Sequence, residues 1–343
     1  MSTIDWLPAG LHPVALRLAR ADGLAYELAQ VALNWSRGTN GDGALTVRQV
    51  ERDEGYYNVE VASIRPVPPI AAMLFSEAIG HLRASLDNVV FHLAEQEHGQ
   101  PLTDSQERAI SMLIYDNQAS YDKKLKSLRS QGLNVFEPTA TLGKRIAAVQ
   151  PFNESAAVPS LSPTLAALMR VPVVNANPLS LLREYSNHDK HRSMRLAAGQ
   201  ALVQNHRDWD RSVAGGMRAI EVGTVLAKVK KGVYTEVDLS ASLMLERPDG
   251  TWVAFGPEID GISTYIADVA IPILVTGLAL PDSLPVTIDL TDNGRSIAER
   301  AEEAGSVRAH ERARVIMMQA LVEAEHQDIK WPETVNKAQD PTG

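Results

Sequence analysis

The sequence of 343 residues contains no cysteine. Disulfide bonds, cysteine-ligated zinc, iron–sulfur clusters and thiol nucleophiles are therefore excluded. The chain also lacks the HExxH pattern, the P-loop, a G-x-G-x-x-G turn after a strand and the G-x-S-x-G nucleophile elbow. Because these motifs of nucleotide, metal and nucleophile sites are missing, we expect no cofactor.

A basic excess and a long apolar run are missing as well. The formal charge is −9 at pH 7, whereas a protein that coats nucleic acid needs a basic balance; a local basic pocket stays open. Residues 1–6 show no basic segment followed by an apolar run, which argues against secretion. The longest apolar stretch, residues 266–280, is interrupted by Asp268 and Pro272 and falls short of the about 20 residues of a membrane span. We therefore expect a cytoplasmic protein that does not enter a membrane.

The composition, 45% apolar and 22% charged, is typical of a folded globular protein. The hydrophobic patterns predict an α+β fold with three parts. Residues 1–200 form a helical bundle with a β-hairpin at about 44–65, residues 201–292 form a β-rich domain with a packed helix, and residues 293–343 form a C-terminal helix and a polar tail. We expect that helix to support a homodimer.

The spacing of apolar residues, together with the prolines and glycines at element ends, predicts the helices and strands of the first part. Apolar residues recur at helical spacing over residues 12–37 and 70–98, and residues 44–50 and 56–64 alternate like the strands of a hairpin. Pro68 and Pro69 suit the entrance of the second helix, and Gly99 suits its end. Residues 103–130, 139–150 and 164–170 predict shorter helices. Asn177 and Pro178 then predict the N-cap and first turn of another helix.

The remaining parts are predicted in the same way. Strands are expected over residues 218–228, 232–245 and 251–255, with a hairpin turn at Arg247-Pro248-Asp249-Gly250. A helix over residues 262–280 should pack on that sheet, followed by a strand over 286–290. Residues 296–325 should form one helix or a helix pair.

Two stretches concentrate histidine, arginine and carboxylate side chains on helices: residues 77–98 and the hexapeptide Asn187-His188-Asp189-Lys190-His191-Arg192. On the first helix, Arg83 and Asp87 have the i, i+4 spacing of an ion pair. A second row of polar residues shares one face of that helix and predicts either a solvated surface or the wall of a cleft. The row consists of Glu77, His81, Asn88, His92 and Glu95.

The hexapeptide places an aspartate on a face that should be buried. In a continuous helix Asp189 shares a face with Leu182, Tyr185 and Leu196. A buried carboxylate without a partner is costly, so Asp189 should meet a cation from another helix, and Arg83 is the best candidate. We therefore expect one polar site between the two helices.

Leu82-Arg83-Ala84-Ser85-Leu86-Asp87, followed by Asp189-Lys190-His191-Arg192, resembles a widespread family of uncharacterised bacterial proteins. Its pattern is N-L-R-S-x-L-D-H on one helix and N-x-x-D-K-H-R on another, with a β-rich second half. The resemblance extends over residues 12–290 and implies no established activity.

The R-x4-H spacing of that pattern also resembles the signature of HEPN-type ribonuclease bundles. The resemblance implies an arginine that stabilises phosphate charge and a histidine that transfers protons. Arg83 matches, but Asn88 stands at the histidine position, and asparagine cannot act as a general acid or base near neutral pH. His92 or His191 would have to take that role.

Other readings of the same residues stay open. His81, His188 and His191 have the chemistry of a three-histidine metal site, and Glu95 and His98 form a single Glu-x-x-His step that has no second copy. Clusters of basic residues fit either a cleft for RNA or another phosphate-bearing ligand, or solvated surface charge. These clusters are Lys123, Lys124, Lys126 and Arg129; Lys144 and Arg145; and Lys228, Lys230 and Lys231.

Two hypotheses follow. In the first, the site is a metal-independent ribonuclease or phosphate-binding site: Arg83, Lys190 and Arg192 stabilise phosphate charge, His191 transfers protons, and Asp87 and Asp189 orient them. In the second, the protein is a non-catalytic interaction or structural protein, and the same residues form a buried polar network.

Overall fold

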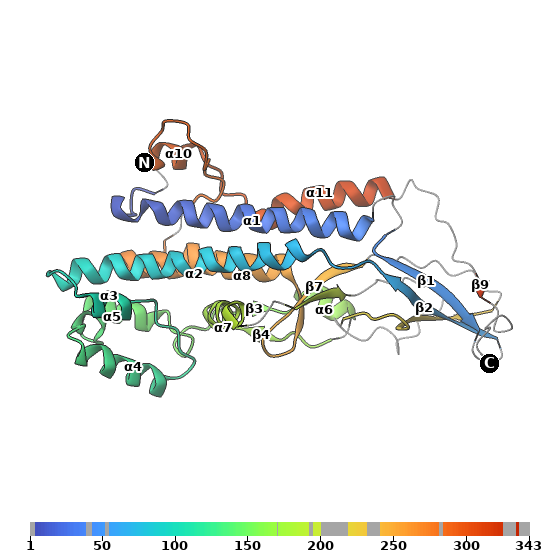
Figure 1. The fold of residues 1–343 in the computed structure, drawn as a ribbon, viewed down its shortest axis with the longest axis horizontal. Coiled ribbons are helices and arrows are strands. Elements are labelled where there is room, and N and C mark those ends of the chain that lie inside the picture. Colours follow the sequence, from blue (N-terminus) through green and yellow to red (C-terminus); the bar gives the residue numbers. More distant parts are fainter. Residues whose placement is uncertain are drawn as a thin grey trace.

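The computed structural model describes residues 4–38, 43–51, 55–169, 171–191, 195–199, 219–231, 241–280, 284–324 and 334–335. Two long helices, α1 (His12–Arg37) and α2 (Pro69–His98), lie side by side and run in opposite directions (Figure 1). The hairpin of β1 (Leu45–Glu51) and β2 (Tyr56–Ile64) joins them and extends beyond their ends. The predicted α+β class, with a hairpin after the first helix and a helix near the C-terminus, is confirmed.

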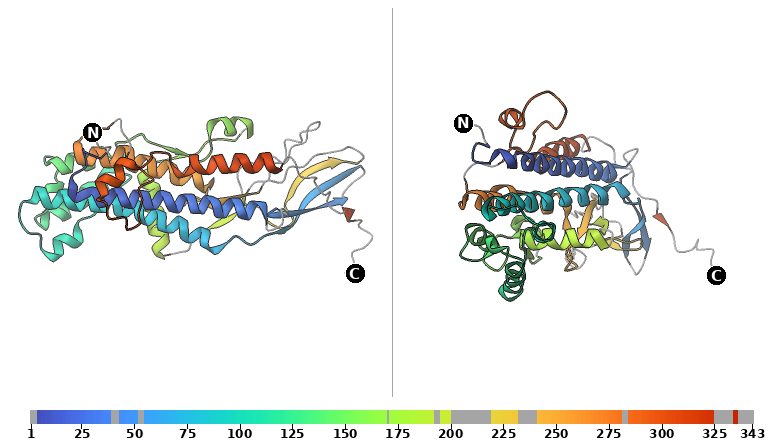
Figure 2. Two further views of the ribbon diagram at one scale, coloured as in Figure 1. Left: turned by 90° about the horizontal axis from the view of Figure 1, so that it is seen from above. Right: turned by 60° about the vertical axis from the view of Figure 1, so that its left-hand side comes forward.

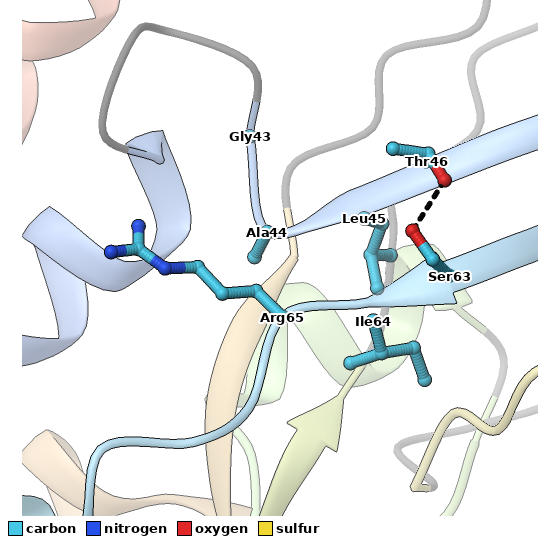
Figure 3. A pocket seen from close by; sticks show the side chains of 7 residues that line it. All are labelled: Gly43, Ala44, Leu45, Thr46, Ser63, Ile64 and Arg65. Carbon is cyan, nitrogen blue, oxygen red and sulfur yellow. Dashed lines mark hydrogen bonds between the residues drawn. The ribbon is translucent and has the colours of Figure 1, made fainter.

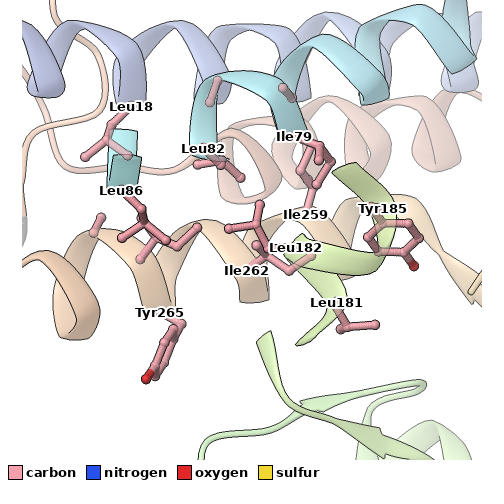
Figure 4. Packing of buried hydrophobic residues seen from close by; sticks show 14 of the residues in the cluster. Leu18, Ile79, Leu82, Leu86, Leu181, Leu182, Tyr185, Ile259, Ile262 and Tyr265 are labelled. Atoms are coloured by element: carbon pink, nitrogen blue, oxygen red, sulfur yellow. The ribbon is translucent and has the colours of Figure 1, made fainter. Parts of the chain in front are cut away.

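Local chemistry sets the ends of these helices. Each helix carries a proline in its first turn, where a missing N–H removes no hydrogen bond. Gly38, at φ 73°, and Gly99, in the left-handed region at φ 70°, end the two helices. Because the apolar positions recur at helical spacing, each helix buries one face against the other elements, as Leu18, Leu82 and Leu86 illustrate (Figure 4).

A composite helix and a C-terminal helix complete the bundle. α8 (Phe255–Tyr265), a π-helical turn (Ile266–Ala270) and α9 (Ile271–Thr276) run on from one another, and α8 packs on both α1 and α2. α11 (Ala309–Ala324) packs on α1, and α10 (Ile297–Glu303) precedes it (Figure 2). The predicted helix over 262–280 therefore starts earlier, at Phe255, and it packs on helices as well as on strands. The predicted helix pair over 296–325 is confirmed.

This composite helix, Phe255–Thr276, spans 22 residues and is long and apolar enough to cross a membrane by length and composition. It is the one such helix in the part of the chain that the structure describes. Half of its most apolar window is buried inside the protein, and the central helix of a folded core meets the same criteria.

Helix α7 (Pro178–His191) carries most of the hexapeptide and crosses α2 on the side opposite α1 (Figures 1 and 2). The Asn177 side chain accepts hydrogen bonds from the N–H groups of Leu179 and Ser180, so the predicted N-cap is confirmed. The ring of Tyr185 meets that of Phe75 edge to face at 5.2 Å between centroids. α7 ends at His191 and Leu196 lies in a strand, so the expected continuous face from Leu182 to Leu196 is wrong.

Strands from distant parts of the sequence pair with one another. The hairpin lies in a sheet of order β6-β2-β1-β9, with β6 (Val225–Lys230) and β9 (Thr334–Val335). A second sheet has the order β5-β7-β8, with β5 (Leu196–Gly199), β7 (Ser242–Glu246) and β8 (Trp252–Ala254). Strands on both sides of residue 200 thus share sheets, and the domain boundary drawn there stays a prediction.

Two predicted elements are wrong. The helix over 103–130 is interrupted: α3 (Asp104–Ala109) and α4 (Gln118–Ser130) are separated by residues 110–117 (the extended segment), which form neither helix nor strand and are extended at both ends, Ile110 and Asn117. Residues 286–290 form no strand; instead, the N–H groups of Val286 and Thr287 donate to the carbonyl of Gly305. The short elements are α5 (Thr141–Ala148), α6 (Pro163–Met169), β3 (Val158–Pro159), β4 (Asn175–Ala176) and 3-10 turns at Ala9–Leu11 and Asn134–Phe136.

Candidate functional site

Arg83 and Asp87 lie on the α2 face that meets the extended segment, residues 110–117. The predicted ion pair is confirmed, with Arg83 Nε 3.1 Å from Asp87 Oδ2. Arg83 Nη2 also donates to the carbonyl oxygen of Met112 at 2.7 Å, and the Met112 N–H donates to Asp87 Oδ1 at 2.8 Å. Arg83 and Asp87 therefore form hydrogen bonds with both the carbonyl and the N–H group of Met112, as the main chain of a neighbouring strand would do.

The rest of the extended segment is held in the same manner. Its apolar side chains, Ile110, Met112, Leu113 and Ile114, are buried. The fully buried Gln150 donates to the Leu113 carbonyl at 2.6 Å and accepts from the Tyr115 N–H at 3.0 Å. Side chains from several elements thus replace a missing sheet partner, because a buried main-chain group without a hydrogen bond is costly.

Helix α7 meets the same segment from its own side. Arg183 donates to the Ile114 carbonyl at 3.3 Å and to Asp116 Oδ2 at 2.6 Å, and the Ser180 hydroxyl donates to Asp116 Oδ1 at 2.5 Å. Burial alone would raise the pKa of Asp116, but the hydrogen bonds from Arg183 and Ser180 outweigh it and lower that pKa. The extended segment therefore links α2 to α7 through polar contacts.

The structure brings the predicted site together only in part. Arg83 and Asp87 are placed as described above. Asp189, Lys190 and His191 lie in the last turn of α7, and their side chains, like the whole of Arg192, fall outside the described residues. Contact between Arg83 and the hexapeptide therefore stays a prediction, and the described partners of Arg83 are Asp87 and Met112.

A buried polar cluster around Arg247 was not predicted from the sequence. Arg247 donates to both carboxylate oxygens of Glu258 at 2.9 and 2.6 Å, and the Tyr185 hydroxyl donates to Glu258 Oε1 at 2.7 Å. Arg247 also donates to the carbonyl groups of Val158 and Val174. Burial, and next the Glu258 carboxylate, raise the pKa of the Tyr185 hydroxyl.

This cluster ties α7, α8 and the turn after β7 together. Arg247 and Glu258 have side-chain exposures of 0% and 1%, so substrate cannot reach them without unfolding the surroundings. Arg247 lay in a segment that the sequence marked only as a hairpin turn. A charged residue in an exposed turn gives no signal that it will be buried.

The polar row on α2 lies beside α1. Asn88, with its amide oxygen turned toward α1, accepts from Arg17 Nε at 3.0 Å and donates to the Ala84 carbonyl at 3.3 Å. Burial and the guanidinium groups of Arg17 and Arg20 lower the pKa of His81. Glu77, Asn88 and Glu95 are exposed. The described part of this row is therefore a mostly solvated edge of the α1–α2 packing.

The metal alternative gains no support from the described residues. They contain no group of three histidine, aspartate or glutamate side chains placed to hold a metal ion. His81 lies near arginines of α1, whereas α7, which carries His188, packs on the other side of α2 (Figures 1 and 2). The His191 side chain lies outside the described residues.

A hollow of about 260 Å³ lies between the start of β1 and the end of β2 (Figure 3). It is lined by Gly43, Ala44, Leu45, Thr46, Ser63, Ile64 and Arg65. Thr46 and Ser63 share a hydrogen bond of 2.6 Å. None of the predicted site residues lines this hollow, and Arg65 is its only charged lining residue.

Comparisons with protein-family models, with curated proteins and with solved structures found no match for this chain.

Proposed function

We propose that this chain is a non-catalytic interaction protein, in which Arg83 and Asp87 form a structural clamp. The observation that carries the proposal is the pairing of both main-chain groups of Met112 with these two side chains. An arginine that stabilises phosphate charge must direct free N–H groups toward the substrate. Arg83 instead directs Nε to Asp87 and Nη2 to a carbonyl.

The role of Asn88 supports the same reading. The ribonuclease hypothesis needs a proton-transfer group one turn after Arg83, and Asn88 stands there. Its amide pairs with Arg17 and the Ala84 carbonyl at the α1 side of α2. Lys190, His191 and Arg192 remain candidate phosphate contacts, and they would have to act without Arg83.

Stability measurements test the clamp. Arg83→Ala and Asp87→Ala should each lower the free energy of unfolding by about 1–3 kcal/mol, because each leaves a main-chain group of Met112 unpaired. The double variant should cost less than the sum of the two. The exposed Arg20–Glu27 pair at 3.2 Å is a matched control. Arg20→Ala should change the free energy of unfolding by less than about 1 kcal/mol.

A cleavage assay tests the competing ribonuclease. Full-length protein incubated with single-stranded RNA in EDTA should leave the RNA intact. Cleavage in EDTA that His191→Ala abolishes without unfolding the chain would overturn the proposal, since arginine and lysine can hold phosphate charge without a metal. Cleavage that requires a divalent metal would also overturn it, in favour of a metal-dependent nuclease.

A further inference from the structure

One face of the hairpin sheet carries several cations and an aromatic ring. In the strand register, Tyr56 is opposite Lys230 and Asn58 is opposite Lys228, while Arg48 is opposite Glu60. Residues opposite one another share a face, as do alternate residues of one strand. This basic face, defined as Arg48, Tyr56, Lys228 and Lys230, therefore lies on β1, β2 and β6.

The groups of the basic face are open to solvent. Lys228 and Lys230 are exposed, and the Tyr56 side chain keeps 39% of its surface accessible. Lys228 Nζ lies 5.0 Å from the centre of the Tyr56 ring, so cation and ring adjoin one another. The opposite face of the sheet holds Val59 and Val229, which are buried.

Two of the three cations of the basic face, Lys228 and Lys230, have no described carboxylate as an ion-pair partner. The third, Arg48, pairs with Glu60 at 3.7 Å. Lys231 differs, since it pairs with Glu51 at 3.2 Å and lies 5.7 Å from the Tyr57 ring. A protein of formal charge −9 thus presents a local positive surface on a projecting sheet (Figure 1).

We propose that the basic face binds single-stranded nucleic acid. Unpaired bases stack on aromatic rings, and lysine and arginine side chains bind the phosphates between them. Lys228 and Lys230 are two residues apart on one strand, about 6.8 Å, a spacing that suits neighbouring phosphates of an extended strand. Tyr56 beside them supplies the stacking surface. The ligand is held without base-specific contacts.

This binding surface shares no residue with the Arg83–Asp87 clamp, so either proposal can fail alone. Failure of the clamp appears as unchanged stability of the Arg83 and Asp87 variants. If the proposal for the basic face is wrong, the protein will not bind single-stranded nucleic acid although its stability is normal.

Fluorescence anisotropy of a labelled oligouridylate with full-length protein in EDTA tests the basic face. Contacts to two or three phosphates predict that log K falls with log salt at a slope of about −1.4 to −2.1. Lys228→Gln with Lys230→Gln should weaken binding at least about tenfold and reduce that slope by about 1.4. Tyr56→Leu should weaken binding about fivefold or more, and Tyr56→Phe should restore it.

Lys123→Gln with Lys126→Gln is the matched control. It removes the same charge from exposed positions of α4, at the other end of the molecule (Figure 1). Binding should not change in this variant, and circular dichroism should show all variants folded. Equal weakening by the control, tighter binding of a duplex, or binding of anionic lipid vesicles but not of the oligomer would overturn the proposal. Comparison of oligouridylate with oligothymidylate distinguishes RNA from DNA as the preferred ligand.

Discussion

Arg247 and Glu258 form a buried ion pair at 2.6 Å, with side-chain exposures of 0% and 1%. The guanidinium group donates to two carbonyl groups besides the carboxylate, and the carboxylate also accepts from Tyr185. Each charged group therefore has a countercharge and further hydrogen-bond partners. A protein interior tolerates a buried charge under these conditions. The pair joins α7, α8 and the turn after β7, and its role is structural.

Glu258→Gln should lower the free energy of unfolding by roughly 3–5 kcal/mol, because it leaves the Arg247 cation buried without a countercharge. Glu27→Gln on the exposed Arg20–Glu27 pair is the control and should cost less than about 1 kcal/mol. Urea denaturation of both variants measures the difference. A cost below about 1 kcal/mol for Glu258→Gln would mean that Arg247 reaches solvent.

Substitution of two helical glycines by alanine should change stability in opposite directions. A Cβ at Gly143 in α5 would lie 1.9 Å from the Glu137 carbonyl oxygen, whereas a Cβ at Gly23 in α1 would meet no atom within 4 Å. Gly143→Ala should therefore destabilise by about 2 kcal/mol or more, since the backbone must shift. Gly23→Ala should stabilise by up to about 1 kcal/mol through helix propensity. Thermal denaturation compares them, and destabilisation by both would contradict the described packing of α1.

At the scale of elements, α11 is attached to the bundle by polar contacts at its first turn. Asp22 of α1 accepts from the Ala309 N–H and from Arg312 Nη2, both at 2.7 Å, and Arg308 pairs with Asp268 at 2.7 Å. Asp22 is buried, and Arg312 also lies 4.9 Å from the Tyr26 ring. A carboxylate from one helix thus caps the start of another.

Burial raises the pKa of Asp22, although the Arg312 and Ala309 hydrogen bonds oppose it. A raised pKa in the folded state means that the folded protein binds more protons than the unfolded chain between 3.8 and the raised value. The stability from this group therefore increases as the pH falls through the raised pKa toward 3.8, and it is lost as the pH rises back through the raised pKa. Wild type should gain stability relative to Asp22→Asn, which cannot titrate. Urea denaturation from neutral pH to about pH 4 measures this difference, and a constant difference would contradict the raised pKa.

At the scale of the whole molecule, buried tyrosines set the alkaline limit of stability. Burial, with a smaller contribution from Asp122, raises the pKa of Tyr121 to about 12, and burial also raises that of Tyr265. Because both pKa values lie above the ordinary tyrosine pKa of 10.0, the stability from these groups should be fully present below pH 10 and be lost as the pH rises through the folded pKa.

Tyr121→Phe should remove part of this alkaline loss, about 2 kcal/mol between pH 10 and pH 12. Denaturation at increasing pH compares the variant with wild type. The same slope in wild type and Tyr121→Phe would show that Tyr121 ionises as freely as in the unfolded chain.

The helix and strand positions that local chemistry controls were predicted from the sequence. The boundaries of α1, α2 and the hairpin follow from apolar spacing, first-turn prolines and the glycines that end helices. These signals act through neighbouring residues, so one stretch of sequence contains them in full. The i, i+4 pair of Arg83 and Asp87 belongs to the same class, because the helix itself brings the two side chains together.

Contacts between distant residues were decided by the tertiary structure alone. The apolar run Ile110–Ile114 follows a helix pattern closely enough to be assigned to one, yet it is extended because Arg83, Asp87, Gln150 and Arg183 bind its main chain. Arg247 finds Glu258 and two carbonyl groups only when the turn after β7 reaches α8. Such partners lie far apart in the sequence, and only packing brings them together. The sequence therefore determined where polar groups gather, while the fold decided that Arg83 and Asp87 bind the main chain of Met112.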